Sequence, residues 1–369
     1  MKWVYSFGNG VADGDGSMKH TLGGKGAGLA EMTKIGLPVP PGFTIVTDVC
    51  NQWMRQGESY PDGLWDQVGV ALASVETSLG KTFGSAENPL LFSVRSGAAA
   101  SMPGMMDTVL NLGLNDQTVV GLGKRSGNEI FAWDSYRRFV TMLGDVVLGI
   151  HYSRFHKIGE EHAGGREPRD MSVAELQDLV GKLKAVVVEQ HGHFPSDPQE
   201  QLRLSVEAVF RSFNSQRARY YRKTNNIPDD CGTAVNIQAM VFGNMGPRSA
   251  TGVAFTRNPK SGIKMFFGEW LPNAQGEDVV AGTHTPNPIN REGGITTGVT
   301  LQEYMPAVYD ELHAVQTKLE THYRDMQDME FTIENGKLYM LQTRNGKRTA
   351  AAAVRIAVEM VKEGVLDEE

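Results

Sequence analysis

Lys25 lies among glycines in the run LGGKGAG at residues 22–28. Glycines let backbone amides approach an anion closely, a helix N-terminus adds partial positive charge, and lysine adds a full charge. A helix is predicted to follow this run and to end at Gly36, because apolar residues recur at helical spacing at Leu29, Met32 and Ile35. The run is a candidate phosphate-binding loop, although it lacks the Walker A spacing. An ordinary glycine-rich turn before a surface helix is the alternative.

Two arginines are candidates for binding further phosphate oxygens. Arg95 ends the run Pro89–Arg95, which is typical of a buried strand, and ligands gather at strand ends in α/β architectures. Its guanidinium fork suits phosphate oxygens, but an arginine that only caps a loop is the structural alternative. Arg138 follows Tyr136 and Arg137 within a helical pattern. There it either reaches a phosphate or forms surface ion pairs, and the sequence by itself favours ion pairs.

Asp328 and Glu330 are candidate metal ligands on a predicted hairpin that spans Asp328–Arg344. Residues two apart on a strand share a face, and carboxylate oxygens are the ligands that Mg²⁺ prefers beside substrate phosphates. The alternative is the solvated edge of a sheet.

The register of this hairpin decides whether Gln342 joins the two carboxylates. A two-residue loop at Asn335 and Gly336 places Gln342 on the face opposite to Glu330. A three-residue loop, Glu334–Gly336 with Gly336 left-handed, places Gln342 on the same face as both carboxylates. A shared site therefore predicts the three-residue loop.

Two further segments have side chains suited to a nucleotide. Glu277, within 273–278, is a candidate ribose-binding carboxylate or part of a polar turn. The strand end Gln238–Val241 either offers backbone groups to a purine edge or is plain core. We dismiss Gly293–Thr296, which superficially resembles a phosphohistidine loop, because Gly298 stands where the histidine is needed.

The elements that position these residues change in kind along the chain. A helix is predicted over Leu64–Leu79, ended by Gly80, and the region from about Asn128 to Arg222 is almost entirely helical in pattern. From Gly232 the pattern becomes β-rich. Further expected elements are a helix that Asp48 caps, a helix that Ser172 and Glu175 cap as a capping box, strands over 233–242, 250–256 and 263–270, and a helix over 309–324.

Composition narrows the class of protein. The 369 residues suggest two to three domains or subdomains, and the net charge of −7 argues against nonspecific nucleic-acid binding. No apolar run approaches the length of a membrane span, and no signal or transit segment is evident. Cys50 and Cys231 have no metal or disulfide spacing, which favours a reducing compartment. A cytoplasmic location is expected, or an organelle if a targeting segment has been trimmed.

Together these segments resemble the N-terminal nucleotide-binding part of the pyruvate phosphate dikinase family, over essentially the whole chain. The segments that carry the resemblance include LGGKGAGLAEM, SVRSG, SMPGMMDTVLNLGLND, DSYRRF, NAQGEDVVAG and DMEFTIENGKLYMLQTRNGK. The related phosphoenolpyruvate synthases, which are water dikinases, have a similar lysine loop but lack the MPGMMDT–NLGLND segment.

The resemblance implies an α+β chain with an ATP-grasp fold and a helical insert subdomain. One ATP-grasp subdomain comprises 1–111 plus about 200–240 and carries the phosphate-binding lysine and arginine. The helical subdomain is 112–199. The second ATP-grasp subdomain, 241–345, holds metal and nucleotide, and 346–369 begin a linker to a phosphohistidine domain.

The resemblance also assigns roles to residues. Lys25 and Arg95 neutralise the polyphosphate of ATP, and Arg344 and Arg138 contact phosphates. Asp328 and Glu330 bind Mg²⁺, and Gln342 positions the metal and the phosphates. Glu277 binds the ribose. The main chain of Gln238, Met240 and Val241 presents groups to adenine.

In the family, a histidine on a separate domain attacks the β-phosphorus of ATP and releases AMP. Inorganic phosphate takes the outer phosphoryl group as diphosphate, and the phosphohistidine then phosphorylates pyruvate at a barrel domain. The histidine motif and the barrel are absent from these 369 residues, so part of a longer enzyme is expected, which binds Mg-ATP and does not turn over pyruvate alone. Ala99 stands where the family usually has arginine, and weaker phosphate binding is expected. A water dikinase and a non-catalytic ATP-binding module are the alternatives.

Overall fold

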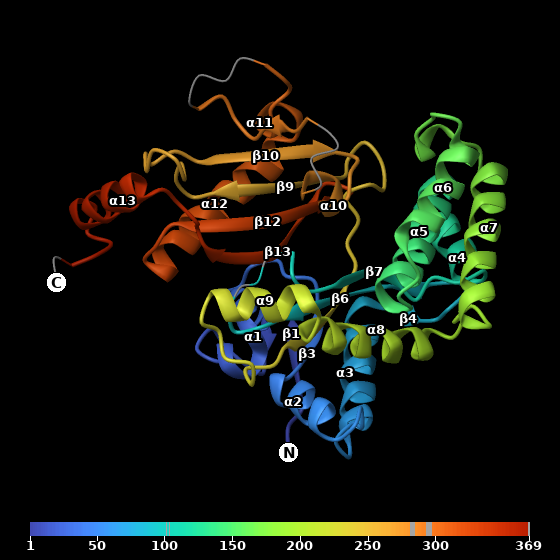
Figure 1. Ribbon diagram of the computed structural model, residues 1–369. Helices are drawn as coiled ribbons and strands as arrows, with labels where there is room; N and C mark the ends of the chain where they lie inside the picture. Colours follow the sequence, from blue (N-terminus) through green and yellow to red (C-terminus); the bar gives the residue numbers. More distant parts are fainter. Residues whose placement is uncertain (101, 103, 281–284, 293–296, 368–369) are drawn as a thin grey trace. The chain divides into compact units, whose positions relative to one another are not determined.

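The computed structural model describes residues 1–100, 102, 104–280, 285–292 and 297–367 (Figure 1). The dismissed Gly293–Thr296 segment lies outside these residues. The chain divides into two compact units. Unit 1 comprises Met1–Lys34 and Pro41–Met240, and unit 2 comprises Ile35–Pro40 and Val241–Glu369.

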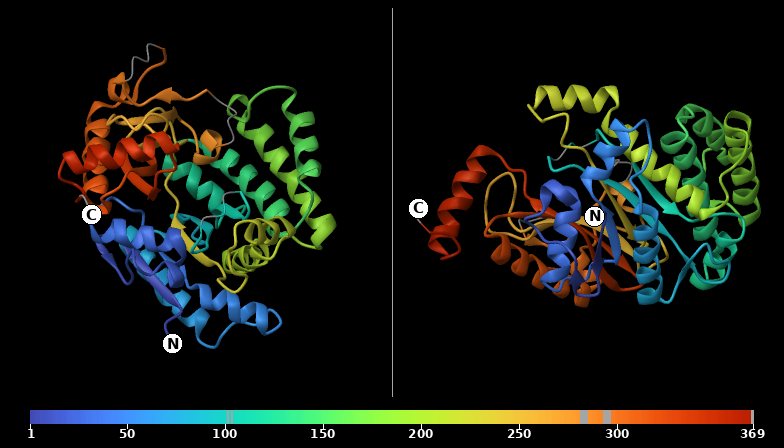
Figure 2. Two further views of the ribbon diagram at one scale, coloured as in Figure 1. Left: turned by 60° about the vertical axis from the view of Figure 1, so that its left-hand side comes forward. Right: turned by 90° about the horizontal axis from the view of Figure 1, so that it is seen from below.

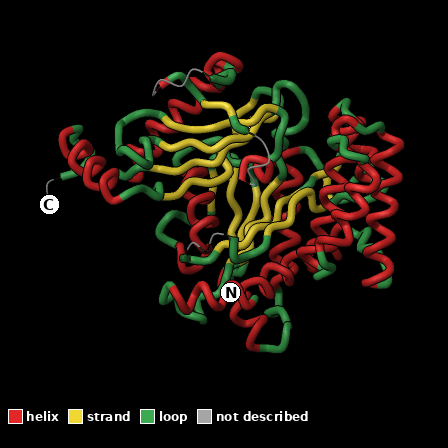
Figure 3. The backbone as a smooth tube through the Cα atoms, turned by 45° about the horizontal axis from the view of Figure 1, so that its top comes forward, coloured by secondary structure: helices red, strands yellow, loops and turns green. Residues whose placement is uncertain are grey.

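Unit 1 is built on a six-stranded sheet in the order β2-β1-β3-β8-β6-β7. Figure 3 draws the strands of both units in yellow. All neighbouring strands in the six-stranded sheet are antiparallel. The inner strands β3 and β8 are buried on both faces, as expected of a sheet covered by helices. The strands are β1 (Val4–Gly8), β2 (Val11–Ala12), β3 (Gly42–Ile45), β6 (Phe92–Gly97), β7 (Thr108–Leu112) and β8 (Ala234–Ala239).

Three helices of unit 1 precede β6, and the region between β7 and β8 is almost entirely helical, as predicted. Four of the later helices, α4 to α7, lie side by side (green in Figure 2). The helices are α1 (Lys19–Lys34), α2 (Thr47–Arg55), α3 (Leu64–Leu79), α4 (Thr118–Ser126), α5 (Glu129–Met142), a π-helix (Leu143–Val147), α6 (Tyr152–Ala163), a 3₁₀ turn (Pro168–Asp170), α7 (Val173–His191), α8 (Pro198–Phe213) and α9 (Gln216–Thr224).

Local signals placed several of these elements correctly. The helix predicted over Leu64–Leu79 is α3, and Gly80 ends it with a φ of 61°. The Ser172 and Glu175 capping box at the start of α7 is present, with each side chain bonded to the other residue's backbone.

Two expectations for unit 1 were wrong. Asp48 does not cap α2, because the helix begins at Thr47 and its N-cap residue is Val46, which has no side-chain oxygen to offer. The strand expected over Pro89–Arg95 is two strands. A short parallel pair, β4 (Thr82–Phe83) with β5 (Pro89–Leu90), precedes β6, which runs on to Gly97.

Unit 2 contains a five-stranded antiparallel sheet in the order β11-β10-β9-β12-β13. Its strands are β9 (Ala250–Phe255), β10 (Phe267–Pro272), β11 (Asn287–Pro288), β12 (Gln327–Glu334) and β13 (Lys337–Asn345). Its helices are α10 (Gly276–Val280), α11 (Leu301–Tyr304), α12 (Pro306–Tyr323) and α13 (Ala350–Lys362).

The strand expected over 263–270 begins later, at Phe267. The Asn258 side chain accepts hydrogen bonds from the backbone of Lys260 and Ser261, and the Asn258 backbone N–H donates to the Ile263 carbonyl. Ile263 therefore closes a turn instead of pairing with β9. The helix expected over 309–324 is α12.

Residues 346–367 contain α13, which packs on the core of unit 2. The buried side chains of Ala352, Ile356 and Met360 form a cluster with Met326, which precedes β12. Each unit therefore combines an antiparallel sheet with helices, and the predicted α+β class is confirmed. In the described part of the chain, no helix combines the length and apolar character that a bilayer crossing requires.

Candidate functional site

The glycine run was expected to precede a helix, but it lies within α1 and interrupts it. α1 already begins at Lys19, and Gly23 breaks it with φ 67° and ψ 168°. The Gly24 N–H donates to the Ala98 carbonyl at 3.0 Å. A Cβ atom at Gly23 would lie 1.6 Å from the Gly97 carbonyl oxygen, so only glycine allows this contact. The helix that carries Lys25 thus restarts directly against the end of β6, two residues after Arg95.

We expect Gly23→Ala to lower the free energy of unfolding of unit 1 by more than about 2 kcal/mol, because it combines a backbone clash with a conformation that only glycine adopts readily. Gly24→Ala is the matched control. A Cβ atom there would lie 3.5 Å from the Ala98 carbonyl, which is an ordinary contact. Denaturant unfolding of both variants checks this prediction, and equal stabilities would contradict it.

Arg95 and Gln238, both predicted site residues, contact each other across β6 and β8. The Arg95 Nη2 atom donates to Gln238 Oε1 at 2.7 Å, and Gln238 is 1 % exposed. The Gln238 side chain therefore orients Arg95, and its backbone belongs to the sheet. The Met240 N–H donates to the Leu91 carbonyl at 2.9 Å. Val241 is the first residue of the second segment of unit 2.

Arg138 lies on α5 and forms an ion pair of the kind that the sequence favoured. Its Nε atom donates to Asp134 Oδ2 at 3.1 Å. The Arg137 Nε atom donates to the other oxygen of the same carboxylate, Oδ1, at 2.7 Å. Burial raises the pKa of Asp134, but the two guanidinium groups outweigh that effect and hold this pKa below its ordinary value. Asp134 is therefore a carboxylate that fixes the direction of both arginines.

The hairpin of β12 and β13 turns at Asn335 and Gly336, which have φ angles of 50° and 81°. Glu334 pairs with Lys337, so the loop has two residues and the expected three-residue loop is wrong. Two successive left-handed residues, Asn then Gly, are the pattern of a tight hairpin turn whose twist matches that of the strands.

A bulge in β13 nevertheless brings Gln342 to the face that carries Glu330. Phe331 pairs with Met340, but Glu330 pairs with Gln342, so Leu341 is an extra residue in β13. The Gln342 Nε2 atom donates to Glu330 Oε1 at 3.2 Å. The shared face is confirmed, although by a bulge and not by the loop length that we expected.

Asp328 and Arg344 complete the same face. They pair directly across the strands, and the Arg344 Nε atom lies 2.6 Å from Asp328 Oδ2. The Asp328 side chain is 6 % exposed and that of Arg344 is 41 % exposed. Two carboxylates and one amide oxygen on one face are oxygen donors that suit Mg²⁺, which usually takes few protein ligands beside phosphates and water. In the described residues, no group of three histidine, cysteine or acidic side chains forms a metal cage.

Glu277 lies in the first turn of α10 and is partly buried. The neighbouring Asp278 makes the local cap, because its carboxylate accepts the Gln275 N–H at 2.9 Å. The turn is therefore held by Asp278, and the role of Glu277 stays a prediction.

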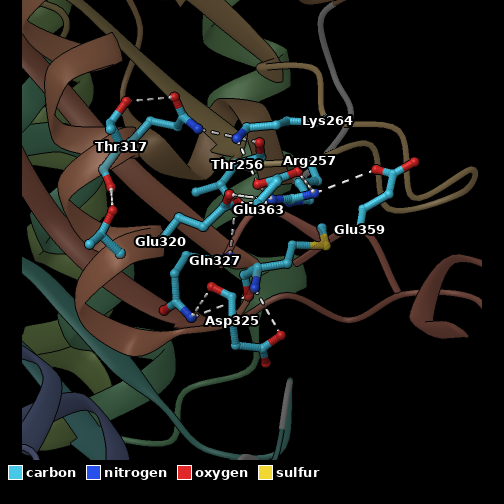
Figure 4. Close-up of polar contacts among 12 residues, drawn as sticks. Thr256, Arg257, Lys264, Thr317, Glu320, Asp325, Gln327, Glu359 and Glu363 are labelled. Carbon is cyan, nitrogen blue, oxygen red and sulfur yellow. Dashed lines mark hydrogen bonds and ion pairs between the residues drawn. The ribbon is translucent and has the colours of Figure 1, made fainter. Parts of the chain in front are cut away.

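A buried ion-pair cluster around Arg257 was not found from the sequence (Figure 4). Arg257 is fully buried, and its guanidinium lies 2.8 Å from Glu320 of α12, 2.7 Å from Glu363 and 3.5 Å from Glu359 of α13. Lys264 lies 2.7 Å from Glu363. The three glutamates lie 63, 102 and 106 positions after Arg257 in the sequence, so no local spacing marks them.

The Arg257 cluster adjoins the face of Asp328 and Glu330 through hydrogen bonds between neighbouring residues. The Thr256 N–H donates to the Gln327 carbonyl, and the Gln327 N–H donates to Thr256 Oγ1, both at 3.0 Å (Figure 4). Gln327 immediately precedes Asp328 in β12. The cluster thus connects the start of the β12–β13 hairpin to α13.

Comparison with known proteins identifies the family. A family model described as "Pyruvate phosphate dikinase, AMP/ATP-binding domain" matches residues 19–78, 58–295 and 301–365. The chain belongs to this family. The resemblance predicted from the sequence is therefore confirmed.

Curated relatives in the pyruvate phosphate dikinase family are similar over the whole chain. The chain is 52% identical to the pyruvate, phosphate dikinases of Rhizobium meliloti and Clostridium symbiosum, and it covers 42% and 41% of their lengths. It is also 52% identical to pyruvate, phosphate dikinase 1, chloroplastic, of Arabidopsis thaliana, of which it covers 38%. The chain thus spans about two fifths of the relatives that it matches.

Proposed function

We propose that this chain is the ATP- and Mg²⁺-binding part of a pyruvate phosphate dikinase. With a phosphohistidine domain outside the chain, it would convert ATP, inorganic phosphate and a histidine into phosphohistidine, AMP and diphosphate. The observation that supports this best is the single face formed by Asp328, Glu330, Gln342 and Arg344, in a chain of an AMP/ATP-binding family.

Unit 1 would neutralise the polyphosphate. Lys25 and Arg95 are held close together because the Gly23–Gly24 break rests on the residues that follow Arg95. Phosphoryl transfer needs charge neutralisation and positioning more than covalent help from the protein. Gln238 would keep the Arg95 guanidinium in place, and Arg138 would contact a phosphate with its direction set by Asp134.

Unit 2 would hold the metal and the nucleoside. Asp328 and Glu330 would bind Mg²⁺, Gln342 would position the metal and phosphates, and Arg344 would contact a phosphate. When bound, Mg²⁺ neutralises the charge that develops on the phosphate oxygens. Further groups would contact ribose (Glu277) and adenine (main chain of Met240 and Val241). This division of roles between two α+β units is that of the ATP-grasp fold.

Inorganic phosphate, the phosphohistidine domain and a pyruvate-binding barrel are the other partners in this proposal, and a cytoplasmic location is part of it. Weaker binding of inorganic phosphate is also part of it. Position 99 lies beside the Lys25 loop, and it is alanine where the family pattern has arginine. A Cβ atom at Gly24 would come within 3.7 Å of the Ala99 carbonyl oxygen.

Calorimetric titration with ATP, with and without Mg²⁺, tests the proposal. We expect Mg²⁺-dependent binding that Glu330→Gln weakens by about tenfold, because one charged metal ligand becomes neutral. Glu311→Gln is the control, since Glu311 is exposed on α12 of the same unit. ATP binding that does not depend on Mg²⁺, or that is equal in both variants, would contradict the metal assignment.

A further inference from the structure

Buried side-chain amide atoms of two residues in unit 2 lack hydrogen-bond partners. In the described part of the chain, both amide atoms of Gln275 and the Oδ1 atom of Asn244 are buried without a partner. Gln275 is 4 % exposed. Such atoms are rare in folded proteins, since burial removes water and leaves the donor or acceptor unsatisfied. Each therefore needs an explanation.

The two amides belong to adjacent segments. The Ala274 N–H donates to the Gly243 carbonyl at 2.9 Å, and a Cβ atom at Gly243 would lie 2.3 Å from the Ala274 carbonyl oxygen. Asn244 follows Gly243 in the chain, and Gln275 follows Ala274. The two side chains thus flank one close backbone contact.

The backbone at Gln275 is fixed, although its side chain is unsatisfied. Its N–H donates to Asp278 Oδ2 at 2.9 Å, and the preceding Ala274 is held by Gly243. A rigid backbone that presents a buried donor and acceptor is suited to a ligand that carries both groups. Gln275 precedes Glu277 by two positions, and Asn244 follows Val241 by three. In the proposed function, Glu277 contacts the ribose and the main chain of Val241 contacts the base.

We propose that Gln275, together with Asn244, recognises the base of the bound nucleotide through the amino-substituted edge of adenine. This inference rests on the proposed function. The adenine amino group would donate to an amide oxygen, and a ring nitrogen would accept from Gln275 Nε2. Adenine offers this donor–acceptor pair, and glutamine and asparagine amides match it.

The test compares two nucleotides on the 369-residue chain and its Gln275→Met variant. The probes are ATP and purine riboside triphosphate, which lacks the amino group. We expect the unsubstituted chain to bind ATP about tenfold more tightly than purine riboside triphosphate, as befits one or two hydrogen bonds in a buried site. In Gln275→Met this preference should fall to about twofold, with ATP binding weakened accordingly.

The control is Gln302→Met, at an exposed glutamine of unit 2, and it should keep the full preference. Thermal unfolding without nucleotide is the second readout. Gln275→Met should unfold within about 2 °C of the parent chain, because an amide without protein partners contributes no hydrogen bond to the empty fold.

The outcomes separate this inference from the proposed function. If the parent chain binds ATP and Gln275→Met binds it equally well, buried water satisfies the amides and the base-recognition site is wrong, while the proposed function stands. If the parent chain does not bind ATP, both are overturned. If Gln275→Met and the equally sized Gln275→Glu both unfold far earlier, Gln275 has protein partners and the inference fails.

Discussion

Lys25→Ala is expected to weaken Mg-ATP binding by roughly 10- to 100-fold, because a charge-assisted contact to phosphate contributes about 1.5–3 kcal/mol. The contact between the glycine break and the end of β6 places the Lys25 loop beside the strand that carries Arg95, so under the proposed function two cations would share one anionic ligand. Isothermal titration calorimetry of the variant measures the effect directly.

Lys34→Ala is the matched control for Lys25→Ala. Lys34 lies in the last turn of the same helix, is 42% exposed and pairs with Asp15 at 3.4 Å. An exposed ion pair of this kind contributes little to stability, and the residue lies outside the proposed site. If Lys25→Ala and Lys34→Ala bind ATP with equal affinity, the specific position of Lys25 does not matter. The total positive charge of the chain would then account for the attraction, and the prediction would be contradicted.

Arg257→Met is expected to destabilise unit 2 by about 3–5 kcal/mol, because it leaves buried carboxylates without their cation. Arg257 is 0 % exposed and the Glu320 side chain is 7 % exposed, so water compensates poorly for the lost charge. Denaturant unfolding, together with hydrogen exchange of α13, measures the loss.

Arg355→Met is the control for Arg257→Met. Arg355 also binds a glutamate of α13, Glu359 at 2.7 Å, but it is 47% exposed and should contribute only a few tenths of a kcal/mol. Adding Glu320→Gln to Arg257→Met should restore part of the stability, since it removes a buried charge. No difference between Arg257→Met and Arg355→Met would contradict a buried, desolvated cluster.

The Arg257 cluster should also respond to acid. The hydrogen bond from Arg257 lowers the pKa of Glu363 below its ordinary value. The stabilisation is therefore fully present above the pKa of the unfolded chain, about 4.3, and is lost as pH falls through the lower pKa of the folded state. Release of α13 should accompany that loss.

Local signals in the sequence predicted much of the fold. The apolar spacing over Leu64–Leu79 gave the bounds of α3, and the Ser172 and Glu175 pair gave the start of α7. These elements were predictable because residues within one turn determine them. The start of β10 was not, because the Asn258 side chain bonds form a turn within a segment of strand-like composition.

The residues that share one face of the β12–β13 hairpin were predictable, but the geometry that brings them together was not. The alternation of Asp328 and Glu330 indicated one face of a strand, and Gln342 and Arg344 were recognised beside them. A bulge adds a residue without any compositional mark, so the way in which Gln342 joins Glu330 could not be predicted from the sequence. The Arg257 cluster and the buried Gln275 amide depend on segments distant in the chain, and only the folded structure brings those together.

The bulge at Leu341 has a second consequence, for association between molecules. β13 is the outermost strand at its end of the five-stranded sheet. An edge strand with a regular ladder of unpaired backbone groups is a template on which another chain can pair. The extra residue interrupts that ladder, and Lys337 and Arg344 place exposed charge near the two ends of the strand. A backbone contact adds to this effect, because the Met340 N–H donates to the Pro38 carbonyl at 2.8 Å. We therefore expect the bulge, this contact and the flanking charges together to make β13 a poor template for edge-to-edge pairing.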